Sequence, residues 1–124
     1  ELLSKRLTLV KNEAFNGKRT PDYFFKNLSV EEKNALIKKD PSYGKIVCRC
    51  EQITEGEIVR AIRENPPAKS VDAVKRRTRA GMGRCQGGFC QPSVASVIAR
   101  ELNIGLEEVT KSGKGSRLLV GRNK

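Results

Sequence analysis

The sequence of 124 residues contains no histidine and no tryptophan, and only 5% of it is aromatic. Histidine is the side chain most often used for general acid–base catalysis, and we find no nucleophile paired with another base. No G-x-G-x-x-G motif follows a predicted strand, so the usual flavin-binding signature is also missing. We therefore expect no catalytic residues in this chain by itself.

Long hydrophobic runs are absent as well. The sequence has no stretch of eighteen apolar residues and no signal peptide, so we expect no transmembrane segment and a cytoplasmic location. Only 37% of the residues are hydrophobic, which is too few for one core along the whole chain. We expect a compact part stabilised by metal and a looser part. Because the chain begins at Glu1 rather than Met, we also expect it to be a piece of a longer protein.

The charge is strongly positive, at +11 from 25 Lys and Arg against 14 Asp and Glu. Such a charge favours acidic partners, among them nucleic acid, an anionic membrane or an acidic protein. The basic residues Lys75, Arg76, Arg77 and Arg79 belong to one of several short predicted helices joined by turns, a pattern that allows a helix-turn-helix interpretation. No aromatic residues for base stacking are interleaved with them. We therefore expect a solvated face and no nucleic-acid partner.

All four cysteines fall into two pairs, Cys48 with Cys50 and Cys85 with Cys90, with 34 residues between the pairs. The C-x-C and C-x4-C spacings predict that the four sulfur atoms meet at one metal centre. In a reducing cytoplasm, cysteines in this pattern are more often ligands than disulfides. Arg49, which lies within the first pair, and Arg84, which directly precedes the second, are the best candidates for offsetting the negative charge of four thiolates.

The second pair requires a loop. Residues five apart lie on different faces of an α-helix, so Cys85 and Cys90 converge only if the segment between them is not helical. Gly87-Gly88 permits such a loop and allows backbone amides to approach sulfur. Pro92 predicts a helix that begins beside Cys90, where the helix dipole favours a thiolate. We expect Met82 and Phe89 to pack over the site and shield it.

The spacing indicates a metal site more strongly than it identifies the metal. Four thiolates suit a [2Fe–2S] cluster or a structural zinc ion. Zinc usually takes C-x2-C pairs, which are absent here, whereas a larger cluster accommodates one close and one wide pair, with one pair on each iron. The spacing therefore favours the cluster, with zinc and a thiol-redox or disulfide role as alternatives.

Capping signals place the remaining elements. Ser29 with Glu32 and Thr54 with Glu57 form two capping boxes. Together with Ser70 and Pro92, these capping boxes predict four helices. They run over 30–39, over 54–63, from 71 to a stop at Gly81-Met82-Gly83, and from 91 to Asn103. One further turn is expected at 106–109. A strand at Leu7 and Leu9, a short helix from Thr20-Pro21 and an extended piece at 114–120 are also expected. We place a domain boundary near residue 40, with a partly disordered connector over 1–40 and a metal-binding domain over 41–124.

Three stretches carry a family resemblance: residues 47–51 (VCRCE), 54–58 (TEGEI) and 75–90 (KRRTRAGMGRCQGGFC). They resemble the [2Fe–2S]-binding domain of the bacterioferritin-associated ferredoxin type, in the version fused at the C-terminus of FAD-dependent glycerol-3-phosphate dehydrogenases. Residues 28–32, 40–41 and 43–44 are similar to the connector that follows the flavin domain in those enzymes.

The resemblance implies a mainly α fold: a small helical domain with the cysteine loops at one end, preceded by a loosely ordered helical connector. It implies that Cys48, Cys50, Cys85 and Cys90 bind a [2Fe–2S] cluster, and that FAD belongs to an upstream domain. The implied function is electron transfer in an oxidoreductase. Its implied partners are the flavin domain of the same polypeptide and an acceptor protein or other subunit. The alternative is a zinc-binding or metal-free interaction module of the same enzyme.

Overall fold

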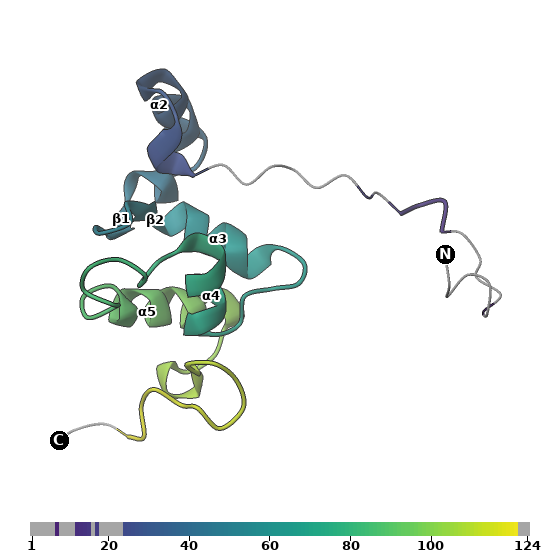
Figure 1. The fold of residues 1–124 in the computed structure, drawn as a ribbon, viewed down its shortest axis with the longest axis vertical. Helices are drawn as coiled ribbons and strands as arrows, with labels where there is room; N and C mark the ends of the chain where they lie inside the picture. The colour runs from purple at the N-terminus through teal and green to yellow at the C-terminus, as the bar shows by residue number, and fades with distance from the viewer. Residues whose placement is uncertain (1–6, 8–11, 16, 18–23, 122–124) are drawn as a thin grey trace.

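The computed structural model describes residues 7, 12–15, 17 and 24–121. Within these residues the chain forms four α-helices, three short 3-10 helices and one two-stranded antiparallel sheet (Figure 1). The elements are η1 (Phe25–Asn27), α2 (Val30–Lys39), η2 (Pro41–Gly44), β1 (Ile46–Cys48), β2 (Ile53–Thr54), α3 (Glu55–Arg63), α4 (Val71–Thr78), α5 (Gln91–Leu102) and η3 (Leu106–Glu108). The strand expected around Leu9 and the helix start at Thr20-Pro21 lie outside the described residues.

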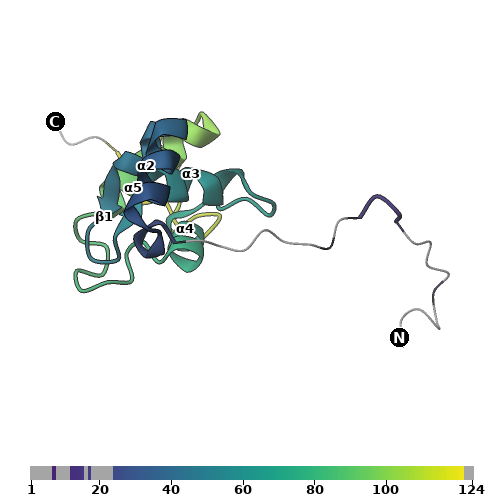
Figure 2. The same cartoon turned by 90° about the horizontal axis from the view of Figure 1, so that it is seen from above.

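Helices α3, α4 and α5 pack on one another to form the body of the domain (Figures 1 and 2). Helix α2 stands at one end of this body, and the segment from η3 onward lies at the other (Figure 1). The buried residues of the body form one hydrophobic cluster, in which Ile53, Ile58 and Ile98 are fully buried. The inward positions predicted for these helices are confirmed for Ile58, Val59, Ile62, Val71, Val74, Val94, Val97 and Ile98.

Helix α3 is the element around which the body forms. Its predicted capping box is present: the Glu57 amide donates to Thr54 Oγ1, and the Thr54 amide and hydroxyl donate to Glu57 Oε2. Both residues are buried, so this box satisfies polar groups that have little access to water. The helix ends at Arg63, as expected ahead of Pro66 and Pro67.

We expect Thr54→Ala to lower the free energy of unfolding by about 1–2 kcal/mol, because the Glu57 amide loses its acceptor and the Glu57 carboxylate loses one of its donors, the Thr54 hydroxyl. Denaturant unfolding followed by far-UV circular dichroism measures this difference. Thr54→Ser keeps the capping oxygen and is the matched control. We expect it to retain most of the stability that Thr54→Ala loses. Equal stability of the alanine and serine variants would contradict a role for the cap.

The end of α4 differs from the prediction. The helix stops at Thr78, and Arg79 takes the left-handed conformation, with φ of 70°, before the glycines at 81 and 83 are reached. The Thr78 side chain helps to end the helix, since its hydroxyl donates to the Val74 carbonyl and accepts from the Ala80 amide. Arg79 then donates from Nε to Glu51 Oε2 at 2.9 Å. Arg79 thus combines a backbone conformation that is uncommon outside glycine with an ion pair to the residue after Cys50.

Helix α2 has the bounds and the capping box that the sequence predicts, with the Glu32 amide donating to Ser29 Oγ. None of its residues is buried, and Leu36 and Ile37 are half-buried. The segments around it contact the body, because the Phe25 amide donates to Glu57 Oε1 at 2.9 Å and Tyr43 is buried against Gly56. The division into domains at residue 40 stays a prediction.

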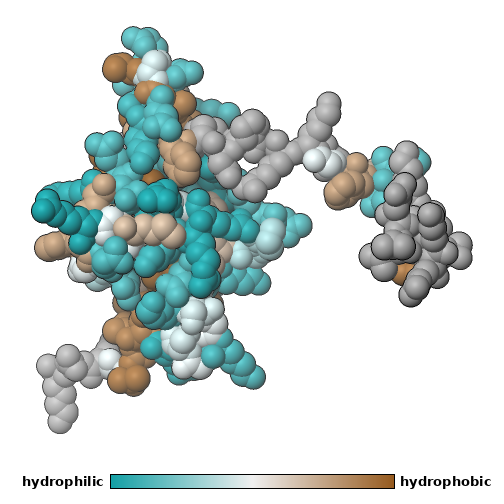
Figure 3. All heavy atoms as spheres, in the orientation of Figure 1, coloured by the Kyte–Doolittle hydropathy of each residue, from teal (hydrophilic) through white to brown (hydrophobic). Residues whose placement is uncertain are grey.

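The C-terminal part of the described chain contains less regular structure than expected. In place of an extended piece over 114–120, a single antiparallel bridge joins Thr110 to Arg117. Hydrophilic side chains cover most of the visible face of the body, and hydrophobic groups gather at α2 and at the C-terminal loop (Figure 3). Among the described residues, no helix has the length and apolar composition needed to cross a membrane.

Candidate metal centre

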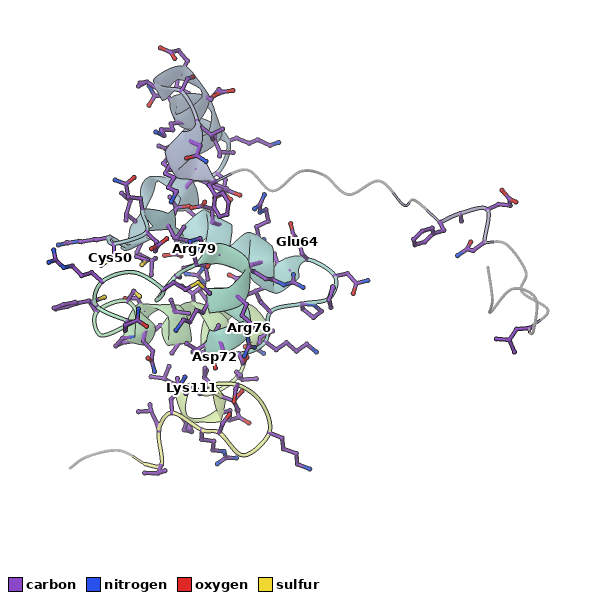
Figure 4. All side chains as sticks on the ribbon, in the orientation of Figure 1. Cys50, Glu64, Asp72, Arg76, Arg79 and Lys111 are labelled. Atoms are coloured by element: carbon purple, nitrogen blue, oxygen red, sulfur yellow. The ribbon has the colours of Figure 1, made fainter. Side chains whose placement is uncertain are left out.

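The fold brings the four cysteines to one cavity of about 950 Å³. Cys48 ends β1 and Cys50 lies in the turn after it, while Cys85 lies in the loop after α4 and Cys90 caps the N-terminus of α5. Sulfur atoms are grouped near the labelled Cys50 in Figure 4. The loop predicted between Cys85 and Cys90 is confirmed, since the segment consists of turns. Four thiols on one cavity are a donor set that suits a four-thiolate metal centre.

The sulfur atoms pair across the two loops. Cys50 Sγ lies 3.7 Å from Cys85 Sγ, which is close to the roughly 3.8 Å between two sulfurs bound to one tetrahedral metal. In the described part of the chain, no group of three or more His, Cys, Asp or Glu side chains converges closely enough for a single ion. The structure thus pairs cysteines from different loops, whereas the sequence predicted that each sequence pair would share one iron.

Local contacts hold the first cysteine loop against the second. Cys48 pairs with Ile53 in the small sheet, and the chain turns between them with Gln52 at a φ of 56°. Gly83 lies directly on Cys50, because a Cβ added to Gly83 would overlap the Cβ of Cys50. Close packing at a glycine and the Arg79–Glu51 ion pair therefore bring the two loops together.

The backbone of the second loop is directed at Cys85. Amide groups of Phe89 and Gly87, followed by the Cys50 thiol, lower the pKa of Cys85 below its ordinary value. Gly87 has a φ of +91°, a conformation that only glycine adopts readily. The prediction that Gly87-Gly88 lets amides approach sulfur is therefore confirmed at Cys85.

Cys90 occupies the predicted position at the start of α5, but its environment is different from the expected one. Only 3% of the residue is exposed, and burial, with the neighbouring Cys48, raises the pKa of Cys90 to about 11. The expectation that the helix N-terminus favours the Cys90 thiolate is therefore wrong for the metal-free thiol. Burial and the neighbouring sulfur destabilise the Cys90 thiolate by more than the helix dipole stabilises it.

Phe89 does not shield the site. Its side chain is 88% exposed, because Cys90 turns into the core and the residue before it points toward solvent. Met82 is half-buried. Arg49 and Arg84 are exposed and line the cysteine cavity, which is where side chains that offset thiolate charge need to be.

The sequence interpretation missed an ion-pair cluster on the cavity wall. Glu55, whose side chain is 7% exposed, accepts from Arg100 at 2.6 Å and lies 2.7 Å from Lys45 Nζ. All three residues line the cavity. Glu55 belongs to the acidic first turn of α3, where a favourable helix dipole already accounts for it. Its cationic partners come from positions 10 and 45 residues away, so no local pattern pointed to them.

These partners predict a pH dependence. Lys45 and Arg100 hold the pKa of Glu55 below its ordinary 4.5. The hydrogen bond from Lys45 has the largest effect and Arg100 adds to it, whereas burial acts in the opposite direction. A lowered folded pKa means that the carboxylate stabilises the fold above about pH 4.5, and that this contribution is lost as the pH falls through the folded pKa. We expect Glu55→Gln to be less stable than the unmodified chain at neutral pH, with the difference narrowing in acid.

Urea unfolding at a series of pH values measures this difference. Glu107→Gln changes the same charge at an exposed position and is the control, for which we expect little effect at any pH. If the stability difference between Glu55→Gln and the unmodified chain stayed constant into acid, it would not come from the ion-paired Glu55 carboxylate.

Comparison with known proteins places these features in a family. The family model described as a BFD-like [2Fe–2S] binding domain matches residues 46–100, the segment that holds all four cysteines. A glycerol 3-phosphate dehydrogenase of Caloramator mitchellensis is 57% identical over 114 residues, which are 92% of this chain and 24% of that protein. No solved structure gave a significant match.

Two further relatives match a shorter segment. One of them, from Escherichia coli strain K12, belongs to an anaerobic glycerol-3-phosphate dehydrogenase; it is 44% identical over 44% of this chain and 10% of its own length. The hydrogen cyanide synthase subunit HcnB of Pseudomonas aeruginosa is 49% identical over 36% of this chain and 9% of its own length. The chain thus spans a quarter or less of these relatives. Residues 46–100 thus match the family of BFD-like [2Fe–2S] binding domains.

Proposed function

We propose that this chain is an electron-transfer domain that binds a [2Fe–2S] cluster through Cys48, Cys50, Cys85 and Cys90. The observation that carries the proposal is the meeting of all four thiols at one cavity, within the segment that matches the family. A cluster bound there supplies one-electron redox chemistry. Cys50 and Cys85 would hold one iron, since their sulfurs are 3.7 Å apart, which leaves the buried Cys48 and Cys90 for the other.

The surrounding residues suit an anionic centre. Backbone amides of the 87–89 loop lower the pKa of Cys85, and Arg49 and Arg84 add positive charge at the cavity. Both features stabilise thiolate charge, and hydrogen bonds to sulfur also tune the potential of an iron–sulfur cluster. The role of this chain's residues is therefore to hold, partly bury and neutralise the centre, with no catalytic side chain of its own.

The relatives support a larger setting for the domain. Glycerol-3-phosphate dehydrogenases are among them, so we propose that the parent polypeptide is an FAD-dependent glycerol-3-phosphate dehydrogenase of the cytoplasm. Electrons would pass between its flavin domain, this cluster and an acceptor protein or other subunit. Exposed Phe89, beside Cys90 and next to Arg49 and Arg84 on the same cavity, is the side chain best placed to contact such a partner.

Anaerobic reconstitution with iron and sulfide tests the cluster. We expect about two iron and two sulfide per chain, visible absorbance that dithionite bleaches, and an electron paramagnetic resonance signal in the reduced protein. Tight zinc with substoichiometric iron, in protein prepared without added zinc, would overturn the proposal in favour of a structural module.

A separate variant tests the contact surface. We expect Phe89→Ala to leave the iron content unchanged and to slow cluster reduction by substrate in the complete polypeptide by roughly tenfold, because an interface anchor is lost. Stopped-flow absorbance measures the rate. Leu106→Ala, which removes an exposed side chain of η3, is the control, and an unchanged rate in Phe89→Ala would contradict the assignment.

A further inference from the structure

The four thiols differ sharply in exposure. Cys48 and Cys90 are 1% and 3% exposed, whereas Cys50 is exposed and Cys85 is partly exposed. The two accessible thiols are also the pair whose sulfurs lie 3.7 Å apart, although they are 35 positions apart in sequence. A small oxidant in solution therefore reaches one pair of cysteines that is already in contact, whereas very little of the other pair is exposed to it.

The contact between Cys50 and Cys85 depends on groups other than the sulfurs. Arg79, at the end of α4, donates to Glu51, the residue after Cys50, at 2.9 Å. Gly83, two residues before Cys85, packs on the Cβ of Cys50. Both contacts join one cysteine loop to the other and need no metal, so they keep the two thiols facing each other in the metal-free chain.

We propose that Cys50 and Cys85 form a specific, reversible disulfide in the metal-free protein, with a low-molecular-weight disulfide such as oxidised glutathione as the oxidant. The Cys50 thiolate attacks one sulfur of the oxidant, which breaks its S–S bond, forms a mixed disulfide and releases one glutathione thiol. The Cys85 thiolate then attacks Cys50 Sγ and releases the second glutathione. Two electrons pass from the cysteine pair to the oxidant, and the two protons end on the released thiols.

This disulfide would reversibly prevent metal uptake. It consumes two of the four sulfurs of the candidate centre, so the oxidised chain loses its four-thiolate donor set until a thiol reductant restores it. The buried pair stays reduced, which makes the modification reversible by one exchange reaction. The bond also ties the loop after β1 to the loop after α4, so the body keeps its fold while the site is closed.

The test uses the metal-free chain, purified without oxygen and incubated with oxidised glutathione. Free thiols are then alkylated, and the protein is digested and mapped by mass spectrometry without reduction. We expect a mass loss of about 2 Da in the intact chain, one cross-link between the peptides of Cys50 and Cys85, and alkylation of Cys48 and Cys90. Cross-links in any other pairing, or four alkylated thiols, would overturn the proposal.

Variants locate the chemistry. Cys50→Ser, at an exposed position, is expected to lose the cross-link completely, whereas Cys48→Ala is the control that should keep it. If circular dichroism shows that Cys48→Ala does not fold, Glu51→Gln is tested instead. It weakens the Arg79–Glu51 ion pair between the loops, so we expect the Cys50–Cys85 disulfide to form several-fold more slowly and with the same pairing.

Metal uptake by the oxidised chain separates this proposal from the cluster assignment. We expect the oxidised chain to take up no cluster until it is treated with dithiothreitol. A chain that forms the Cys50–Cys85 bond but never binds iron would overturn the proposed function alone. A chain that binds the cluster but gives no such bond would overturn the disulfide alone.

Discussion

Cys90→Ser is expected to reduce the iron bound after anaerobic reconstitution by at least roughly ten- to a hundredfold. Substitution of residues that only support metal ligands already lowers metal affinity by that factor. Cys90 is 3% exposed and caps α5 beside Cys48, so no water or neighbouring side chain readily replaces its sulfur. Iron and sulfide analysis, together with visible absorbance, measures the loss. The same substitution at Cys48, Cys50 or Cys85 is expected to act in the same direction.

The control for Cys90→Ser lies on the same cavity. Ser93 lines the site on the first turn of α5 and is exposed, so we expect Ser93→Ala to leave cluster content and the reduced-state resonance signal unchanged. Unaltered iron content and spectra in Cys90→Ser would show that the four-cysteine assignment is wrong. Far-UV circular dichroism of both variants separates loss of a ligand from loss of the fold.

Gly83→Ala is the substitution outside the cysteines with the largest expected effect. The added methyl group would overlap the Cβ of Cys50 and come within 3.4 Å of the Cys50 carbonyl carbon and of Glu51 Cγ. One cysteine loop must then move away from the other, at a cost of about 1–3 kcal/mol for overpacking. We expect a lower free energy of unfolding and weak cluster binding, because Cys50 is carried away from Cys85.

Gly113→Ala is the matched control for this change, because among the described residues none other than its chain neighbours lies within 4 Å of the position that its Cβ would occupy. We expect it to match the unmodified chain in iron content and in urea unfolding. A Gly83→Ala variant that binds iron normally and unfolds at the same urea concentration would contradict the close contact between the loops.

The helices were predictable because their signals are local. Capping boxes at Ser29 and Thr54, and Pro92 with the apolar stripe after it, define helix starts through groups that are only three or four residues apart. The bounds of α2 and the end of α3 agree with those signals. The end of α4 did not follow from its glycines: the helix stops at Thr78, and Arg79 takes the left-handed conformation and pairs with Glu51 from another part of the chain.

Two cysteine pairs in a chain without histidine were enough to predict a thiolate metal site, and the stretches 47–51, 54–58 and 75–90 carried the family resemblance. Sequence spacing alone determined that the segment between Cys85 and Cys90 must be a loop, since helix geometry forbids the alternative. It favoured one iron for each sequence pair, because C-x-C and C-x4-C describe neighbours along the chain only, whereas the structure places Cys50 beside Cys85.

Tertiary structure decided the rest. Packing of Gly83 on Cys50 and the Arg79–Glu51 ion pair put Cys50 beside Cys85, and burial of Cys90 in the core turned Phe89 outward. The same packing gathered Lys45, Glu55 and Arg100 on the cavity wall. These contacts join residues 10 to 45 positions apart, and such distances are set by how the helices pack, which no local pattern records.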